Sequence, residues 1–234
     1  MFFIVLILNN LITSFSVRIS HRHKFVFLAT PRTASTSVRD ALDDYSDIKS
    51  VYKTQVSTTN PFYHHISVKE LIPIFNERKW DWDEYESACF VRNPYDRVVS
   101  LYHHYLETGS RTAPDKSLIY NVARKIRYKY LPLKNFAEYV RSINIESRLQ
   151  IPVSKFVQDE AGEVRVSSIL KFEDLPNCFC EWSRTAGVVD AGSSLHRLNS
   201  SRERRDYRGY YNEETRQIVH DKYRDDIDKF NYEF

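Results

Sequence analysis

Glycine is scarce in this chain, with only five glycines among 234 residues. That scarcity excludes collagen-like repeats, flexible glycine linkers and the glycine-rich turns that cradle nucleotides in many enzymes. The Gly-Lys-Ser/Thr ending of the Walker loop is also absent, and no clear Mg²⁺-binding aspartate follows a later strand. Any phosphate site in this chain must therefore be built from other residues.

Cysteine is also rare, with three residues at positions 89, 178 and 180. An odd number, two of them only two positions apart, does not indicate a disulfide framework. No His or Cys nearby completes a zinc site, so we expect thiols and no bound metal. The net charge of +3 is too small to indicate nucleic-acid binding by itself, and we expect no nucleic-acid partner.

Long apolar runs are missing apart from residues 1–17, which are interrupted by Asn9 and Asn10. A membrane-spanning helix needs about 20 apolar residues, and a signal peptide needs a positively charged start. Three interpretations stay open: a weak membrane anchor, an ordinary extension, or translation from a start upstream of the functional one. Membrane-associated and cytoplasmic locations are both left open. We expect residues 1–23 to be an extension or anchor, and residues 24–234 to form one domain.

Apolar periodicity predicts strands that alternate with helices along this domain, which favours an α/β fold with a mainly parallel sheet. A capping box at Ser67–Glu70 predicts the start of one helix, which contains Pro73. The expected strands are residues 24–28, 88–91, 155–157 and 164–172. The expected helices are residues 35–44, 67–75, 94–106, 136–143 and 213–230.

The first candidate phosphate site is the polar turn at residues 29–37, between the strand at 24–28 and the next helix. A helix N-terminus has unpaired N–H groups and the positive end of the helix dipole, so it attracts phosphate. Arg32 adds a cation that can donate two parallel hydrogen bonds to phosphate oxygens. The alternative is a Ser/Thr-rich helix cap with a solvated arginine. The candidate phosphate-binding residues are Arg32, Thr33, Ala34, Ser35, Thr36 and Ser37.

The second candidate site begins at Arg92, where the strand at 88–91 ends. Asn93-Pro94 is a turn signal that starts a helix, and Ser100 lies about two turns into it. We expect Arg92 and Ser100 to share one phosphate; the alternative is that Arg92 is a structural ion-pair partner. Arg97 is expected to face a carboxylate such as Asp43, Asp44 or Asp96.

These segments resemble a known family. Residues 31–37, Pro-Arg-Thr-Ala-Ser-Thr-Ser, resemble the 5′-phosphosulfate-binding loop of Golgi-type carbohydrate sulfotransferases, and most of all that of the heparan sulfate 2-O-sulfotransferase group. Residues 92–100 resemble the 3′-phosphate motif of these enzymes. Similarity continues to the C-terminal end in residues 169–175, 196–200, 210–215 and 226–234. The resemblance covers the chain from about residue 24 onwards.

The resemblance implies a P-loop-like sulfotransferase fold, with a mainly parallel central sheet flanked by helices. It also implies 3′-phosphoadenosine 5′-phosphosulfate (PAPS) as the donor co-substrate, no metal, and a hydroxyl acceptor that is expected to be a carbohydrate. Arg32 stands where the family usually has lysine. Arginine keeps the positive charge, but it is bulkier and presents its donors as a planar fork.

The resemblance also assigns roles to individual residues. Tyr63–Ser67 resembles the family segment that carries a catalytic histidine, so we predict His65 as the base, with His64 as the alternative. Arg32 and the loop amides are expected to stabilise the 5′-phosphate, while Arg92 and Ser100 hold the 3′-phosphate. Arg202 and Arg204 are candidates for a basic loop that closes over the nucleotide. The alternatives are a helix-entry loop with two surface histidines, and a solvated charged face.

Two other classes of function stay open at this point. One is a kinase or NTPase with a degenerate phosphate loop, which the missing Gly-Lys-Ser/Thr disfavours. The other is a non-catalytic nucleotide- or glycan-binding protein of the same fold, which the arginine at position 32 leaves possible. Acceptor pockets are built from loops that follow no general sequence code, so the acceptor's identity and the oligomeric state are not predicted.

Overall fold

The computed structural model describes residues 17–234, except for residues 52–54, 64, 111–121, 123–134 and 199–205. The chain divides into two compact units. The first unit comprises Met1–Arg92 and Val153–Glu203, and the second comprises Asn93–Pro152 and Arg204–Phe234. Each unit is built from two separate stretches of the chain.

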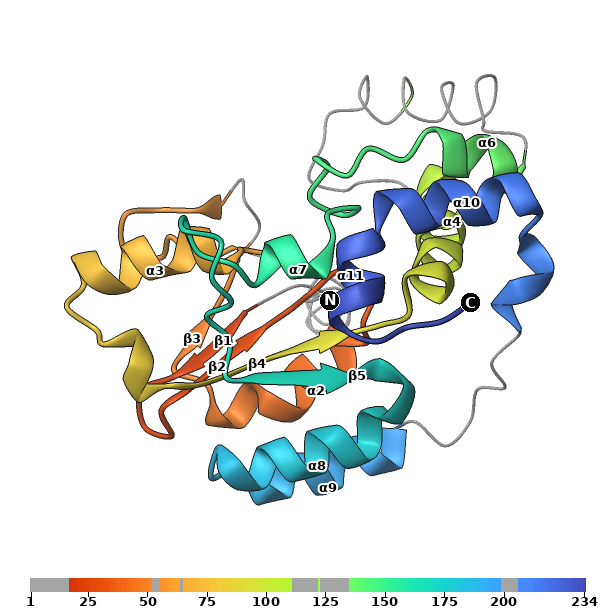
Figure 1. The fold of residues 1–234 in the computed structure, drawn as a ribbon. Coiled ribbons are helices and arrows are strands. Elements are labelled where there is room, and N and C mark those ends of the chain that lie inside the picture. The colour runs from red at the N-terminus through yellow and green to blue at the C-terminus, as the bar shows by residue number, and fades with distance from the viewer. Residues whose placement is uncertain (1–16, 52–54, 64, 111–121, 123–134, 199–205) are drawn as a thin grey trace. The chain divides into compact units, whose positions relative to one another are not determined.

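The described residues of the first unit form a five-stranded sheet in the order β3-β1-β2-β4-β5 (Figure 1). Strands β2, β4 and β5 are parallel neighbours, whereas β1 is antiparallel to both β2 and β3. This mostly parallel sheet with flanking helices confirms the predicted α/β class. The strands are β1 (Arg18–Ser20), β2 (Phe25–Leu28), β3 (Ile48–Lys49), β4 (Glu86–Val91) and β5 (Ser168–Lys171).

Strand β1 lies upstream of residue 24, where the sequence predicts the domain to begin, and the sheet therefore extends past that boundary. Arg18 and Ser20 are polar but fully buried, which hides the strand from an apolar-pattern search. Arg18 is compensated by Asp43, whose carboxylate lies 2.6 Å from the guanidinium. The turn from β1 to β2 is tied to Asp47, which accepts hydrogen bonds from the backbone N–H groups of His21 and Arg22 at 2.5 and 3.2 Å.

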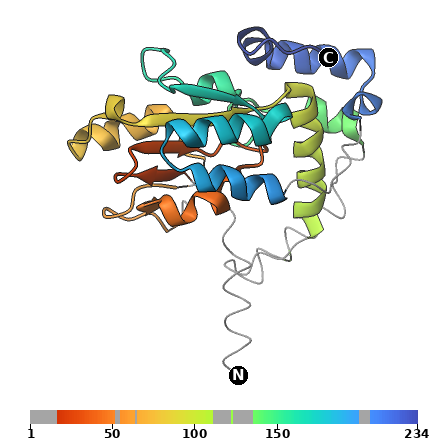
Figure 2. The same cartoon turned by 90° about the horizontal axis from the view of Figure 1, so that it is seen from below.

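Strands β2 and β4 read as continuous apolar runs because both faces of the sheet are covered. Phe25, Phe27 and Phe90 contribute to a core with residues of α2 (Ser35–Leu42), α8 (Leu175–Thr185) and α9 (Val189–Leu198). Figure 2 shows these helices on one face of the sheet. Figure 1 shows α3 (Val68–Glu77) and α7 (Val153–Phe156) on the opposite side.

The second unit is helical and rich in aromatic side chains. Its core cluster combines residues of the N-terminal half of α4 with residues of α6, α10 and α11. The ring of Phe234 meets the rings of Tyr95, Tyr207 and Tyr211 edge-on, at centroid distances between 4.9 and 6.0 Å. The helices are α4 (Pro94–Ser110), α6 (Phe136–Arg141), α10 (Glu213–Lys222) and α11 (Arg224–Lys229).

Arg97 on α4 is fully buried in this unit and faces a carboxylate, as expected. Its Nη1 lies 3.8 Å from the carboxylate of Asp226, which is also buried. Its Nη2 donates to the carbonyl oxygens of Leu149 and Ile151 at 3.2 and 2.7 Å. Asp226 was not among the carboxylates named from the sequence, because it comes from α11, far along the chain.

Most of the predicted elements are confirmed, with shifts at their ends. The capping box forms as expected, with Ser67 N–H donating to the Glu70 carboxylate at 2.9 Å. The strand expected at residues 155–157 was wrong: the segment belongs to α7, whose Val153 and Phe156 are buried with helical spacing. Of the strand expected at residues 164–172, only β5 (Ser168–Lys171) forms a strand. The long helix expected at residues 213–230 is broken at Tyr223 into α10 and α11.

Among residues that the structure describes, no helix is both long enough and apolar enough to cross a lipid bilayer. Residues 1–16, which carry most of the predicted weak anchor, lie outside the described residues. The possible membrane association therefore stays a prediction.

Candidate functional site

The candidate site lies at the edge of the sheet where the parallel strands end. Leu28 of β2 pairs with Cys89 of β4, and Val91 of β4 pairs with Lys171 of β5. Because parallel strands end at a common edge, the residues that follow them leave the sheet as neighbours. The loop after β2, the residue Arg92 after β4 and the residue Phe172 after β5 are brought together in this way.

Two buried threonines anchor the loop that follows β2. The hydroxyl of Thr30 donates to the carbonyl oxygen of Phe90 on β4 at 2.5 Å. The hydroxyl of Thr33 donates to the carbonyl oxygen of Thr30 at 2.9 Å. Thr33, expected to offer its hydroxyl to a phosphate, directs it to the loop's own backbone instead. Thr30 was not singled out from the sequence, because its role depends on the neighbouring strand.

Residues 32–34 of this loop have an unusual backbone conformation. Arg32 and Ala34 adopt left-handed conformations with φ of 65° and 56°, while Thr33 between them does not. Alternation of this kind turns successive N–H groups toward one concave side and forms an anion-binding nest. Ala34 is also the N-cap of α2, and in the described part of the chain no side chain caps that helix end. The N-terminal N–H groups of α2 and the nest therefore make one electropositive surface.

The remaining candidates of this loop sit on the first turn of α2. Thr36 is exposed and Ser37 is half-buried, so both hydroxyls are accessible at the helix start. The N–H groups of Ser37 and Val38 donate to the carbonyl oxygen of Ala34 at 3.1 and 3.3 Å. Ser35 begins the helix, and its backbone lies where an anion bound at the N-terminus would meet it.

Arg92 connects the two predicted motifs. Its Nη1 donates to the carbonyl oxygen of Arg32 at 3.0 Å. The central carbon of its guanidinium lies over the ring of Phe172, 4.4 Å from the ring centroid. The structure therefore places the first and second candidate phosphate segments in direct contact, with two cationic residues at one sheet edge.

His65 is buried and lies against the start of the same loop. Its Nδ1 is 2.5 Å from the carbonyl oxygen of Ala29, the residue directly after β2. A carbonyl oxygen can only accept, so Nδ1 carries the hydrogen and the neutral ring has its lone pair on Nε2. The segment is supported by Glu70, whose carboxylate accepts hydrogen bonds from Tyr63 and Ser67. The alternative base, His64, lies outside the described residues.

Three further candidates do not belong to the first unit's described loops. Ser100 is half-buried on α4 in the second unit. Arg202 and Arg204 lie outside the described residues. Their predicted roles stay predictions.

Asn93, which follows Arg92, has a structural role that the sequence indicated only as a helix start. Its Oδ1 accepts from the N–H of Tyr95, which caps α4. Its Nδ2 donates to the carbonyl oxygen of Glu233 at 2.7 Å and to the hydroxyl of Tyr207 at 3.2 Å. Within the second unit, this one side chain ties the start of α4 to the last residues of the chain.

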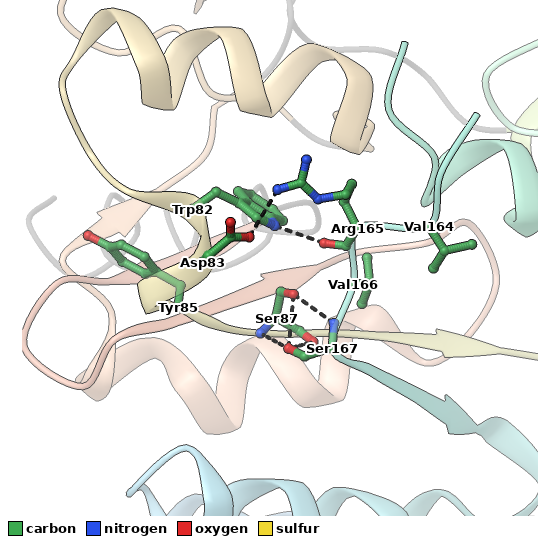
Figure 3. Close-up of a pocket in the computed structure, with 8 residues that line it drawn as sticks. All are labelled: Trp82, Asp83, Tyr85, Ser87, Val164, Arg165, Val166 and Ser167. Atoms are coloured by element: carbon green, nitrogen blue, oxygen red, sulfur yellow. Dashed lines mark hydrogen bonds and ion pairs between the residues drawn. The ribbon is translucent and has the colours of Figure 1, made fainter. Parts of the chain in front are cut away.

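A separate pocket of about 230 Å³ lies at the opposite edge of the sheet, where β4 and β5 begin (Figure 3). The indole of Trp82 donates to the carbonyl oxygen of Arg165 at 2.8 Å, and Ser87 and Ser167 exchange hydrogen bonds. The Arg165 guanidinium pairs with Asp83 at 2.9 Å, so its charge is compensated. This pocket is distinct from the edge that carries Arg92.

The described residues contain no group of three or more His, Cys, Asp or Glu side chains arranged to hold a metal ion. The candidate site itself offers cations, backbone N–H groups and the imidazole of His65. Phe172 was missed by the sequence reasoning, although its position as the last residue of a predicted strand was a usable signal.

The sheet, the loop that leads into α2 and the cationic edge define an α/β protein of the P-loop-like class. A comparison with protein-family models gives one match, described as the sulfotransferase family, over residues 16–233. The chain belongs to the sulfotransferase family, and its reaction class is the transfer of a sulfuryl group to a hydroxyl-bearing acceptor. Comparisons with curated proteins and with solved structures gave no significant match.

Proposed function

We propose that this protein transfers a sulfuryl group from PAPS to a hydroxyl group of a carbohydrate. The observation that carries the proposal is the 3.0 Å hydrogen bond from Arg92 to the backbone of Arg32. PAPS carries phosphate at two positions of one nucleotide. A protein that selects it needs two anion sites within the span of a single small molecule, and this contact brings two such candidates together.

The residues at the sheet edge suit the two ends of this donor. The nest at Arg32–Ala34 and the N-terminus of α2 offer backbone N–H groups to the 5′-phosphosulfate, and Arg32 adds positive charge. Thr33 contributes through its backbone, while Thr36 and Ser37 add hydroxyl donors. Arg92 is assigned to the 3′-phosphate. Ser100, Arg202 and Arg204 are proposed for the same nucleotide on the family resemblance alone.

Arginine in place of lysine at position 32 is compatible with this role. A guanidinium keeps its charge at any physiological pH and donates in a plane, whereas an ammonium acts as a compact point charge. The carbonyl of Arg32 is held by Arg92, so the backbone from which this side chain departs has a defined position.

The proposed chemistry is an in-line transfer. The acceptor oxygen forms a new bond to sulfur as the bond from sulfur to the phosphate oxygen breaks, and the nucleotide leaves as 3′-phosphoadenosine 5′-phosphate (PAP). Positioning and electrostatic stabilisation dominate such reactions, as they do in phosphoryl transfer. We assign the acceptor's proton to Nε2 of His65, the ring nitrogen that the contact with Ala29 leaves basic.

The carbohydrate acceptor is the finer part of the proposal. It is supported by the resemblance of residues 31–37 and 92–100 to the loops of Golgi-type carbohydrate sulfotransferases, above all the heparan sulfate 2-O-sulfotransferase group. Membrane attachment through residues 1–17 rests on composition alone.

A binding panel tests the donor assignment. Calorimetric titration with PAP, AMP and Mg²⁺-ATP should show the tightest binding for PAP. Replacing Arg92 by Gln should weaken PAP binding by about 10- to 100-fold, the loss expected for a charged hydrogen bond, and should leave AMP binding nearly unchanged. Preference for Mg²⁺-ATP over PAP would instead support the kinase or NTPase alternative.

A transfer assay tests the chemistry. The full chain is incubated with sulfur-labelled PAPS over a glycan array, and the labelled spots identify the acceptor. Binding of PAP without transfer to any glycan or other hydroxyl compound would support the non-catalytic alternative. The same assay on glycans that differ in one hydroxyl gives the position that is sulfated.

A further inference from the structure

Phe172 is placed beside Arg92 by the register of the sheet. Val91 is the partner of Lys171 in the parallel pair of β4 and β5, so the next residue on each strand leaves the sheet at the same level. These next residues are Arg92 and Phe172. The guanidinium of Arg92 lies over the ring of Phe172, with its central carbon 4.4 Å from the ring centroid.

The aromatic ring and the loop contact both hold Arg92. The ring of Phe172 attracts the cation that lies over its face. The hydrogen bond from Nη1 to the carbonyl oxygen of Arg32 holds the same guanidinium at a second point. A free arginine side chain loses rotamer entropy when it binds an anion, and a side chain that is already held in place loses less.

We propose that Phe172 is a positioning residue that holds Arg92 ready for the 3′-phosphate and thereby sets the preference for a 3′-phosphorylated nucleotide. This inference rests on the proposed function, because it concerns the same donor. Phe172 is only half-buried, and it packs at the margin of the first unit's core rather than inside it. The position of the Arg92 cation over its ring distinguishes Phe172 from a side chain that only packs in the core.

The test compares two ligands that differ only in the 3′-phosphate. Dissociation constants for PAP and AMP are measured with the full chain, with Phe172→Leu, which keeps apolar bulk without a ring, and with Phe172→Tyr, which keeps the ring. We expect Phe172→Leu to weaken PAP binding by about 3- to 30-fold, the range of a cation–π contact, and to leave AMP binding unchanged. Phe172→Tyr should bind both ligands like the natural protein.

A double variant tests whether Phe172 acts through Arg92. If Phe172 acts through Arg92, then Phe172→Leu combined with Arg92→Gln should bind PAP no more weakly than Arg92→Gln alone. Additive losses would overturn the inference. Equal weakening of PAP and AMP by Phe172→Leu would also overturn it, because that result indicates a general structural role. If Phe172→Leu does not fold, Phe172→Met provides the second ring-free variant for the same comparison.

Failure of this inference is distinguishable from failure of the proposed function. If the natural protein does not prefer PAP to AMP, the donor assignment falls, and the role of Phe172 falls with it. If the natural protein prefers PAP and Phe172→Leu keeps the full preference, only the positioning role is overturned.

Discussion

The Nδ1 atom of His65 lies 2.5 Å from the carbonyl oxygen of Ala29, at the point where the central strand β2 becomes the candidate phosphate loop. The ring is buried, and because a carbonyl oxygen only accepts, this contact places a hydrogen on Nδ1. When the ring is neutral, its lone pair is therefore on Nε2. The contact also holds the start of the loop, so this structural role and the proposed role as a base must be separated by experiment.

Replacing His65 by Asn separates them. The Asn Nδ2 can still donate to Ala29, but the side chain cannot accept a proton. We expect turnover to fall by about 10²- to 10⁴-fold, the usual contribution of a general base, while PAP affinity stays within about threefold. Steady-state kinetics and calorimetry on the same preparation provide both values.

His65→Ala is the companion variant. It should lose the same turnover and should also lower the free energy of unfolding by about 1–3 kcal/mol, because the buried carbonyl of Ala29 loses its partner. Turnover near the natural level in His65→Asn would show that the contact with Ala29, and not proton transfer, is what the residue contributes.

Replacing Ala34 by glycine is expected to stabilise the folded protein. Its φ of 56° lies in the left-handed region, which costs an alanine about 1–2 kcal/mol, whereas glycine adopts it freely. After the larger unfolded-state entropy of glycine is subtracted, Ala34→Gly should stabilise the protein by about 0.5–1 kcal/mol. Ala41→Gly, in the body of α2, is the matched control and should lose about 1 kcal/mol. Urea denaturation of both variants gives the signs, and a loss in both would contradict the left-handed assignment.

The buried pair of Arg97 and Asp226 predicts a large loss of stability in the second unit. Replacing Asp226 by Asn removes a carboxylate that faces the buried Arg97 guanidinium, which should cost about 3–5 kcal/mol. The exposed pair of Arg224 and Asp221, 3.1 Å apart, provides the control: Asp221→Asn should cost far less. Chemical denaturation measures both, and similar small losses in the two variants would refute a structural role for the buried pair.

Asp47 should make stability depend on pH in the acid range. Burial alone would raise the pKa of this carboxyl, but the hydrogen bonds from Arg22, His21 and Ser20 outweigh it and hold the pKa below its usual value. A lowered pKa means that the stabilisation is present above about pH 4 and is lost as the pH falls through the folded-state value. Asp47→Asn should cost about 1 kcal/mol at pH 7, since the group is exposed, and less at pH 3. A cost that does not change between these pH values would exclude this linkage.

The elements that could be predicted from the sequence are those with a strong local signal. Strands β2 and β4 are apolar runs, and α3 has its capping box. Strand β1 was not predicted because its end residues Arg18 and Ser20 are polar, and their burial depends on partners elsewhere in the chain. The strand expected at residues 155–157 failed for the opposite reason, since a short apolar run fits a helix as well as a strand.

The same distinction between local signals and distant contacts applies to the residues of the candidate site. Arg32, Arg92 and His65 were predicted because they stand in recognisable motifs, and the family that these motifs indicated is shown. The hydroxyl of Thr33 turns inward, and Phe172 lies beside Arg92, through contacts with residues distant in sequence. Such contacts depend on strand order and register, which a single sequence does not specify.

The pairing of Val91 with Lys171 has a consequence for the chain's tolerance of change. Loss of one residue from β5 would advance every following position by one place, and Glu173 would arrive where the ring of Phe172 now lies. A carboxylate there would pair with the guanidinium of Arg92. The alignment of two short strands thus decides which side chain lies against Arg92.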